Sequence, residues 1–184
     1  EEKEKKLIAM RVKDSKKLLD SAVSRLARDV KKICKYDIVK ISPERYNTLY
    51  KKFGDKGLNK LLAWGHARVI ENLMKKNNCD YVITDKFGDE RYLKNALMEN
   101  GKKANIIQRV RGESDVAVAA ASILARAEFL KTLKRLSLEV GYKLPKGSTH
   151  VETVAKLMIK KYGEKILPMI AKTHFKTTKR VIEK

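Results

Sequence analysis

The sequence predicts an α/β protein in which short strands alternate with helices. Long segments carry apolar residues at helical spacing, short β-rich runs lie between them, and polar or glycine-containing breaks separate the two kinds of segment. Hydrophobic residues make up 43% of the 184 positions, which is enough for one sizeable core, and only 3 prolines and 9 glycines occur. This composition excludes a disordered chain.

The first half of the chain alternates helical and extended patterns. In order, the sequence predicts a capped basic amphipathic helix opening at residues 14–15, a half-buried strand over 36–41, a short helix from Ser42-Pro43 to about Phe53, a turn over 54–57 and a longer helix from about Asn59.

The second half continues the alternation and then becomes helical and basic. We expect a strand over 79–84 with Asp85 at its far end, a helix opened by 88–90 and closed by 100–101, a strand over 104–110, a turn over 111–115, a long helix containing 119–130, two short basic helices after 141–147, and a tail over 174–184. With at least three strands separated by helices, the pattern is α/β.

The charge of the chain points to a polyanionic partner. Lys and Arg number 43 against 22 Asp and Glu, so the formal net charge is +21. A thermophile-like surface would enrich both signs together, whereas the stretch from Lys131 to Lys184 holds 14 Lys and Arg but only four Glu and no Asp. Nucleic acid is therefore the favoured partner, ahead of an acidic protein or a lipid surface.

Secretion and membrane insertion are not indicated. No apolar stretch approaches the ~20 residues that a transmembrane helix needs, and the first residues carry no apolar signal region. The two cysteines, Cys34 and Cys79, are far apart and lack metal-type spacing, which favours a reducing, cytoplasmic setting over a disulfide framework.

Two acidic residues are candidates for metal chemistry. Asp85 follows a predicted strand, so its carboxylate would lie at the sheet edge where α/β proteins place their sites. Glu113 precedes an alanine-rich helix that could pack closely on a sheet and bring Glu113 toward Asp85. Converging carboxylates in a basic protein indicate Mg²⁺ held against a phosphate. A strand-end turn and a favourable helix N-terminus explain the same residues without chemistry.

Basic residues at helix starts are candidate phosphate contacts. A capped helix at 14–17 would combine free backbone N–H groups with Lys16 and Lys17, although a solvated first turn explains the pattern equally well. Asn59-Lys60, at the start of another predicted helix, is a weaker candidate of the same kind. The three histidines share no metal-ligand spacing and receive no role, and the scattered Tyr and Phe residues do not support a stacking platform.

Several motifs resemble the type 2 ribonucleases H, and bacterial ribonuclease HIII most of all. The alanine-rich motif with its preceding acid is highly specific, and the resemblance covers nearly the whole chain. The motifs are residues 14–18, 42–47, 58–64, 84–87, 113–126 and 171–178. The acid at Glu113 is similar to that of ribonuclease HIII, since ribonuclease HII generally carries Asp there.

The resemblance implies a ribonuclease H-like fold, with a mixed central sheet flanked by helices and a helical C-terminal extension. It also implies Mg²⁺-dependent endonucleolytic cleavage of the RNA strand in RNA/DNA hybrids, with Mn²⁺ as an alternative metal. In the family, four carboxylates hold two ions, one of which activates water while the other stabilises the leaving 3′ oxygen. No membrane and no obligatory protein partner are implied.

The resemblance assigns roles to individual residues of this sequence. The third and fourth carboxylates match Asp85 and Glu113. The expected contacts to the substrate backbone are Ser15, Lys16 and Lys17, with Asn59 and Lys60 as weaker candidates and Arg126 and Lys146 as phosphate neighbours.

The chain departs from the family pattern at its beginning. The adjacent Asp-Glu pair that supplies the first two carboxylates has no counterpart before residue 14. We therefore expect 1–130 to be a catalytic core lacking its leading strands, 131–184 to be a basic helical extension of it, and the sequence to be part of a longer protein. Two alternatives stay open: a non-catalytic nucleic-acid-binding protein on the same scaffold, and ribonuclease HII-type cleavage at embedded ribonucleotides.

Overall fold

The chain forms two compact units. The computed structural model describes residues 2–12, 15–54, 56–147 and 149–182. Unit 1 spans residues 1–39 and 58–129, and unit 2 spans 40–57 and 130–184. Thus 40–57 groups with the C-terminal unit, and the division into a catalytic core and an extension at residue 130 stays a prediction.

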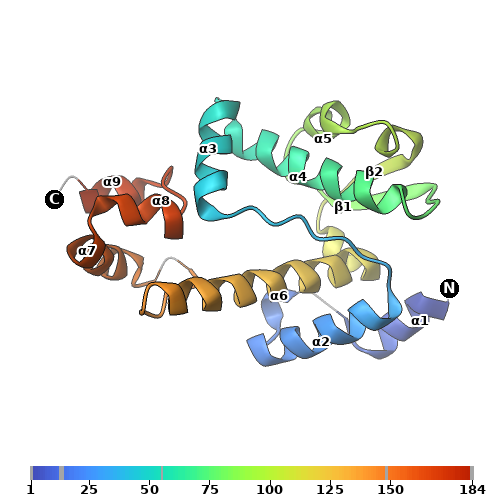
Figure 1. The fold of residues 1–184 in the computed structure, drawn as a ribbon. Helices are drawn as coiled ribbons and strands as arrows, with labels where there is room; N and C mark the ends of the chain where they lie inside the picture. The colour runs from blue at the N-terminus through green and yellow to red at the C-terminus, as the bar shows by residue number, and fades with distance from the viewer. Residues whose placement is uncertain (1, 13–14, 55, 148, 183–184) are drawn as a thin grey trace. The chain divides into compact units, whose positions relative to one another are not determined.

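Unit 1 is built from helices around a small parallel sheet (Figure 1). Its elements are α1 (Glu2–Ala9), the 3₁₀ turn η1 (Ser15–Lys17), α2 (Asp20–Ile33), α4 (Gly57–Met74), β1 (Tyr81–Asp85), α5 (Glu90–Ala96), η2 (Gly101–Lys103), β2 (Asn105–Arg109), η3 (Gly112–Ser114) and the first part of α6 (Val116–Glu139).

The sheet pairs β1 with β2 in parallel, and α5 makes the crossover between them. The register sets Tyr81 beside Asn105 and Asp85 beside Arg109. The core beneath this sheet comes from α4, α5 and the strands. Its buried residues are Ala67, Ile70, Leu93 and Leu97, against which Val82, Phe87 and Ile106 pack. Burial of Leu93 on α5 and Ile70 on α4 packs these two helices against the strands. This packing fixes the position at which β1 ends.

The predicted strand over 36–41 does not form. Residues 35–42 run as an extended connection between α2 and α3, and among the described residues no strand pairs with them. Asp37, Ile38 and Val39 are all half-buried, so the alternating sequence pattern corresponds neither to alternating burial nor to sheet pairing. A strand needs a hydrogen-bonded neighbour as well as an alternating pattern.

The helix expected from residues 14–15 begins later, at Asp20. Leu19 adopts an extended conformation as its N-cap and is 78% exposed, and Ser15 starts a separate 3₁₀ turn. Asp14, the first residue of the predicted cap, lies outside the described residues. We expected a phosphate-binding site at a capped helix N-terminus over residues 14–17. The helix does not begin there, because its N-cap is Leu19.

Another helix ends earlier than predicted. α5 stops at Ala96 because Leu97 leaves the helix and turns into the core. Asn100 and Gly101, expected as the stop signal, instead donate backbone hydrogen bonds to the carboxylate of Glu71 on α4. The buried Glu71 thereby fixes the chain before β2.

Unit 2 is helical. It contains α3 (Pro43–Phe53), the second part of α6, α7 (Val151–Tyr162), η4 (Glu164–Ile166), α8 (Leu167–Ile170) and α9 (Lys176–Ile182), which lies in the segment expected as a tail. The Ser42 hydroxyl caps α3 by accepting from the Arg45 N–H, as predicted. A core of Val140, Leu144, Val154 and Met158 joins α6 to α7.

Candidate active site

Asp85 lies at the carboxyl end of β1, where its side chain is exposed. The parallel ladder continues one step beyond it, because the Lys86 N–H donates to the Arg109 carbonyl over 2.9 Å. The carboxylate itself is held by the backbone: the Gly112 N–H donates to Asp85 Oδ1 over 2.9 Å. Asp85 therefore stands at the end of a strand with one carboxylate oxygen held by the backbone.

Gly112 allows the loop after β2 to approach this strand end. A Cβ atom at position 112 would lie 2.9 Å from the Asp85 Cα, which is shorter than side chains tolerate. The preceding Arg111 takes a left-handed conformation with φ of 56°, which turns the chain from β2 into η3. Glu113 is the next residue of η3, so the structure brings the loop that carries Glu113 against Asp85.

A second carboxylate of this loop has a structural role. Asp115 Oδ1 accepts from the Ala117 N–H over 2.9 Å and from the Val118 N–H over 3.4 Å, which caps the start of α6. Its other oxygen lies 3.9 Å from the Arg109 guanidinium. Asp115 is occupied in this way, whereas no hydrogen bond or ion pair joins Glu113 to another residue within the described part of the chain.

The donor set is suited to a hard divalent cation but is incomplete. Carboxylate oxygens are the ligands that Mg²⁺ and Mn²⁺ prefer. Across the residues that the structure describes, however, no three His, Cys, Asp or Glu side chains gather in a way that could hold a metal ion. Asp85 and Glu113 thus fit part of a metal site and do not make a whole one.

Sequence reasoning missed His66, which lies beside the site. Its ring stacks on Phe87, two residues beyond Asp85, with centroids 5.0 Å apart and planes 18° apart. Burial lowers the pKa of His66, and the charge of Asp85 opposes part of that lowering. The available signal was position: His66 lies two helical turns after Asn59 on α4, hence on the same face.

Asn59 packs on the same loop. A Cβ atom on Gly88 would lie 3.2 Å from the Asn59 amide nitrogen, so this side chain fills the space left by Gly88. Lys60, its neighbour, is exposed. The structure therefore places Asn59 against the loop that follows Asp85, and Lys60 at the surface of α4.

The Ser15 turn is tied to α6. The Ser15 hydroxyl is buried and lies 2.7 Å from the hydroxyl of Ser122. The Arg126 guanidinium donates to the Ser15 carbonyl and, over 3.0 Å, to Asp20 Oδ1. Only 3% of Ser15 is exposed, and its direct contact with a substrate stays a prediction.

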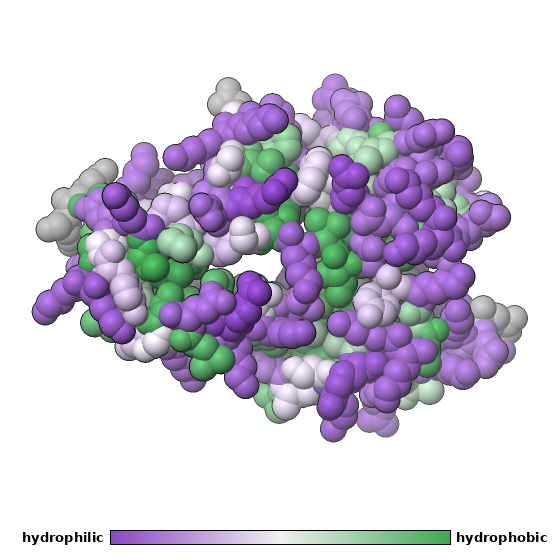
Figure 2. Space-filling model, viewed as in Figure 1, coloured by the Kyte–Doolittle hydropathy of each residue, from purple (hydrophilic) through white to green (hydrophobic). Residues whose placement is uncertain are grey.

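The four predicted lysines are all at the surface. Lys16 and Lys17 are exposed in η1, Lys60 is exposed on α4, and Lys146 is exposed in unit 2. Unit 2 holds 19 Lys and Arg against 6 Asp and Glu, a net charge of +13 out of +21. Hydrophilic side chains cover most of the visible face (Figure 2). This surface is suited to a polyanion.

Comparison with known proteins decides the family. The family model described as "Ribonuclease HII" matches residues 1–178. This chain belongs to the ribonuclease HII family. The resemblance inferred from the motifs is confirmed.

Individual relatives in this family point to its HIII branch. Ribonuclease HIII of Protochlamydia amoebophila (strain UWE25) is 47% identical over 180 residues, which cover 97% of this chain and 59% of the relative. Ribonuclease HIII of Chlamydia felis (strain Fe/C-56) is 40% identical over 186 residues, covering 100% and 61%. The chain thus spans about three fifths of the length of these relatives.

A solved structure confirms the fold. The crystal structure of Bst-RNase HIII in complex with Mn²⁺ superimposes with a TM-score of 0.87 at 30% identity, covering 98% of this chain and 60% of that one. The ribonuclease H-like fold predicted from the motifs is therefore confirmed.

Some of the aromatic residues of this ribonuclease HII family member meet in unit 2. The His174 ring stacks on Tyr50 with centroids 4.2 Å apart and lies 4.1 Å from Phe175. Lys172 Nζ lies 4.6 Å from the Tyr46 ring centroid. Asn47 on α3 binds the same segment, so we interpret these rings as packing of residues 168–175 on α3.

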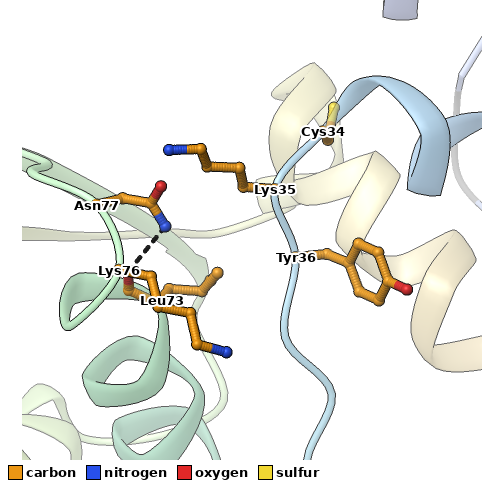
Figure 3. Close-up of a pocket in the computed structure, with 6 residues that line it drawn as sticks. All are labelled: Cys34, Lys35, Tyr36, Leu73, Lys76 and Asn77. Atoms are coloured by element: carbon orange, nitrogen blue, oxygen red, sulfur yellow. Dashed lines mark hydrogen bonds between the residues drawn. The ribbon is translucent and has the colours of Figure 1, made fainter.

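A shallow hollow of about 300 Å³ lies away from all predicted site residues (Figure 3). It is lined by Cys34, Lys35, Tyr36, Leu73, Lys76 and Asn77. The side chain of Asn77 turns back to donate to the Leu73 carbonyl over 2.9 Å. This hollow adds nothing to the candidate active site.

None of the helices that the structure describes combines the length and apolar character needed to cross a membrane.

Proposed function

We propose that this chain is part of the catalytic domain of a ribonuclease HIII-like endoribonuclease, which hydrolyses the RNA strand of RNA/DNA hybrids. The observation that carries the proposal is the hydrogen bond from the Gly112 N–H to Asp85, which sets the loop of Glu113 against a strand-end carboxylate. Family membership and the identity with ribonuclease HIII proteins support it.

Asp85 and Glu113 supply metal ligands in this proposal. We take the metal to be Mg²⁺, with Mn²⁺ as an alternative, in two sites to which Asp85 and Glu113 contribute two of the carboxylates. When bound, such ions provide a nucleophilic water and neutralise charge on the leaving oxygen. The chain itself contributes a fixed carboxylate, because the Gly112 N–H holds Asp85 Oδ1 before any ligand arrives.

The basic surface holds the substrate by its backbone. Exposed Lys16, Lys17 and Lys60 in unit 1 and Lys146 in unit 2 are suited to phosphate contacts, which position a nucleic acid without reading its sequence. Discrimination of a hybrid then rests on A-like shape and 2′-hydroxyl groups. We propose that the enzyme works in the cytoplasm without an obligatory protein partner.

The decisive experiment replaces one carboxylate by its isosteric amide. The protein encoded by the complete gene, purified with Mg²⁺ or Mn²⁺, should cut an RNA/DNA hybrid, and Asp85→Asn should abolish cutting while hybrid binding persists. Asp80→Asn is the matched control, since Asp80 lies exposed just before the opposite end of β1. Undiminished cutting by Asp85→Asn would exclude this site.

Two substrates separate the alternatives within the family. A ribonuclease HIII-like enzyme should prefer runs of several ribonucleotides, whereas cutting at a single embedded ribonucleotide would indicate ribonuclease HII-type activity. A wild-type protein that binds the hybrid but cuts neither substrate would indicate a non-catalytic binding protein. The residues encoded before Glu1 give an independent check, because an Asp-Glu pair on an apolar strand there would favour the enzyme over the binding protein.

A further inference from the structure

Two hydrogen bonds join the Ser15 turn to the helix that begins just after Glu113, and a third joins that helix to the start of α2. Ser122 and Arg126 lie four residues apart, on one face of α6. The Ser122 hydroxyl meets the Ser15 hydroxyl, and Arg126 bonds both the Ser15 carbonyl and Asp20, the first residue of α2. The turn is therefore held by its side chain, by its backbone and by the helix that follows it.

The Ser15 carbonyl is the centre of this arrangement. It accepts from the Leu18 N–H over 3.2 Å, which closes the turn, and it also accepts from Arg126. Lys16 and Lys17 lie between Ser15 and Leu18 in the sequence, and their side chains are exposed. The backbone turn that carries both lysines is thus held by contacts from α6.

Arg126 is poorly placed to contact a substrate directly. Its side chain is 26% exposed, and two of its donors already serve Ser15 and Asp20. Asp20 also offsets its charge. A guanidinium suits this bridging role because its planar fork reaches two acceptors at once, which a single ammonium group cannot do in the same geometry.

We propose that Arg126 and Ser122 are positioning residues that fix Lys16 and Lys17 relative to Glu113 through the rigid helix α6. Along the axis, Ser122 and Arg126 lie about 9 and 15 Å from the start of α6 at Val116. The same helix therefore begins next to the candidate metal ligand Glu113 and also holds the turn that carries the two proposed phosphate contacts. This inference rests on the proposed function and explains the serine and arginine of the alanine-rich motif.

Salt dependence of hybrid binding tests the proposal. With the complete protein in EDTA, fluorescence anisotropy on a labelled RNA/DNA hybrid should show that Lys16→Gln/Lys17→Gln lowers the slope of log affinity against log salt by nearly two, about 0.9 per phosphate. Arg126→Met should lower it by more than one, although it removes a single charge. Arg135→Met is the control, since Arg135 lies on the same helix in an exposed pair with Glu139 and should lower the slope by at most one.

Two further variants decide between positioning and direct contact. If Arg126 acts through the lysines, adding Arg126→Met to Lys16→Gln/Lys17→Gln should change affinity by less than twofold. Arg126→Lys keeps the charge but should still lose about fivefold in affinity. Wild-type affinity for Arg126→Lys, or a further loss of threefold or more in the triple variant, would make Arg126 a direct phosphate contact and overturn the proposal.

Amide hydrogen exchange provides a test without substrate. Arg126→Met should speed exchange of the Leu18 N–H at least tenfold, and Ser122→Ala, which preserves the helix, should speed it less. Arg135→Met should leave it unchanged. Unchanged Leu18 exchange in both α6 variants would refute the positioning role, whatever the binding result. Failure of the wild-type protein to prefer a hybrid over duplex DNA would instead refute the proposed function.

Discussion

The Gly112 N–H donates to Asp85 Oδ1 over 2.9 Å, and a Cβ atom at position 112 would lie equally close to the Asp85 Cα. The hydrogen bond and the close approach come from one residue. The absence of a side chain at position 112 lets the loop approach Asp85, and the Gly112 N–H then orients the candidate carboxylate. The chain makes the approach after the left-handed Arg111 turns it away from β2. The geometry of the site therefore depends on Gly112, a residue without a side-chain functional group.

Gly112→Ala should impair catalysis more than binding. The added methyl group must displace η3 from the end of β1, so we expect kcat to fall at least tenfold, hybrid affinity to change less than twofold, and stability to fall by about 1–3 kcal/mol. Cleavage kinetics and thermal unfolding measure these effects. A variant with wild-type kcat would show that the approach of η3 does not matter for the reaction.

The control for that variant is Gly65→Ala in the interior of α4, where an added Cβ meets nothing within 4 Å. Alanine is the better helix former, so Gly65→Ala should raise the free energy of unfolding by about 0.5–1 kcal/mol. Catalysis should not change. Loss of activity in both variants would indicate a general intolerance to substitution and not a defect of the site.

Glu71 should make the stability of unit 1 sensitive to acid. Burial would raise its pKa, but hydrogen bonds from the Gly101 N–H, the Asn100 side chain and the Asn100 N–H outweigh burial and lower it. A pKa below its unfolded value of about 4.3 means that the unfolded chain binds the proton more tightly. The stabilisation is complete above that value and is lost as the pH falls through the folded pKa.

Glu71→Gln should therefore lower stability at pH 7 and flatten its dependence on pH between about 5 and 3. Urea unfolding across that range measures both effects. Glu99→Gln, an exposed acid beside Asn100, should retain the wild-type profile. An equally steep profile in Glu71→Gln would place the acid-sensitive group elsewhere.

The sequence predicted the regular elements that carry strong local signals. The Ser42-Pro43 cap, the strand ending at Asp85 and the long alanine-rich helix all formed. The prediction of a strand over 36–41 was wrong because an alternating pattern alone does not make a strand, which also requires a hydrogen-bonded neighbour. The helix α5 ends earlier than predicted because Leu97 leaves the helix to pack in the core. No local sequence pattern indicates this packing.

The candidate site was predictable in its chemistry but not in its contacts. Asp85 and Glu113 followed from strand-end placement and from a family resemblance, and the structure brings their segments together. The family resemblance predicted Ser15 as a contact to the substrate backbone and Arg126 as a phosphate neighbour. Only the fold shows that they bond each other's segments across 111 positions of sequence. Long-range pairs of this kind leave no periodic trace in a single sequence.

Asn47 should be a key residue for the stability of unit 2. Its amide nitrogen donates to the carbonyls of Pro168 and Ala171 over 3.1 and 2.9 Å, and its oxygen accepts from the Thr173 N–H over 2.9 Å. Asn47→Ala leaves all three backbone groups without this partner, so we expect a loss of about 2–4 kcal/mol. Thr48→Ala, next to it but exposed, should cost less than about 1 kcal/mol. Denaturant unfolding distinguishes the two, and equal losses would contradict this role.

His66 reports on the charge of Asp85. Burial lowers the pKa of His66 below its usual value of about 6.5, and the negative charge of Asp85 raises it part of the way back. Asp85→Asn removes that charge, so the pKa of His66 should fall further, which an NMR titration of the imidazole protons measures. Asp80→Asn, just before the other end of β1, should leave the titration unchanged. An unchanged or raised pKa of His66 in Asp85→Asn would show that the imidazole does not sense this carboxylate. A fall would measure how strongly the Asp85 carboxylate acts on the imidazole, without substrate and without turnover.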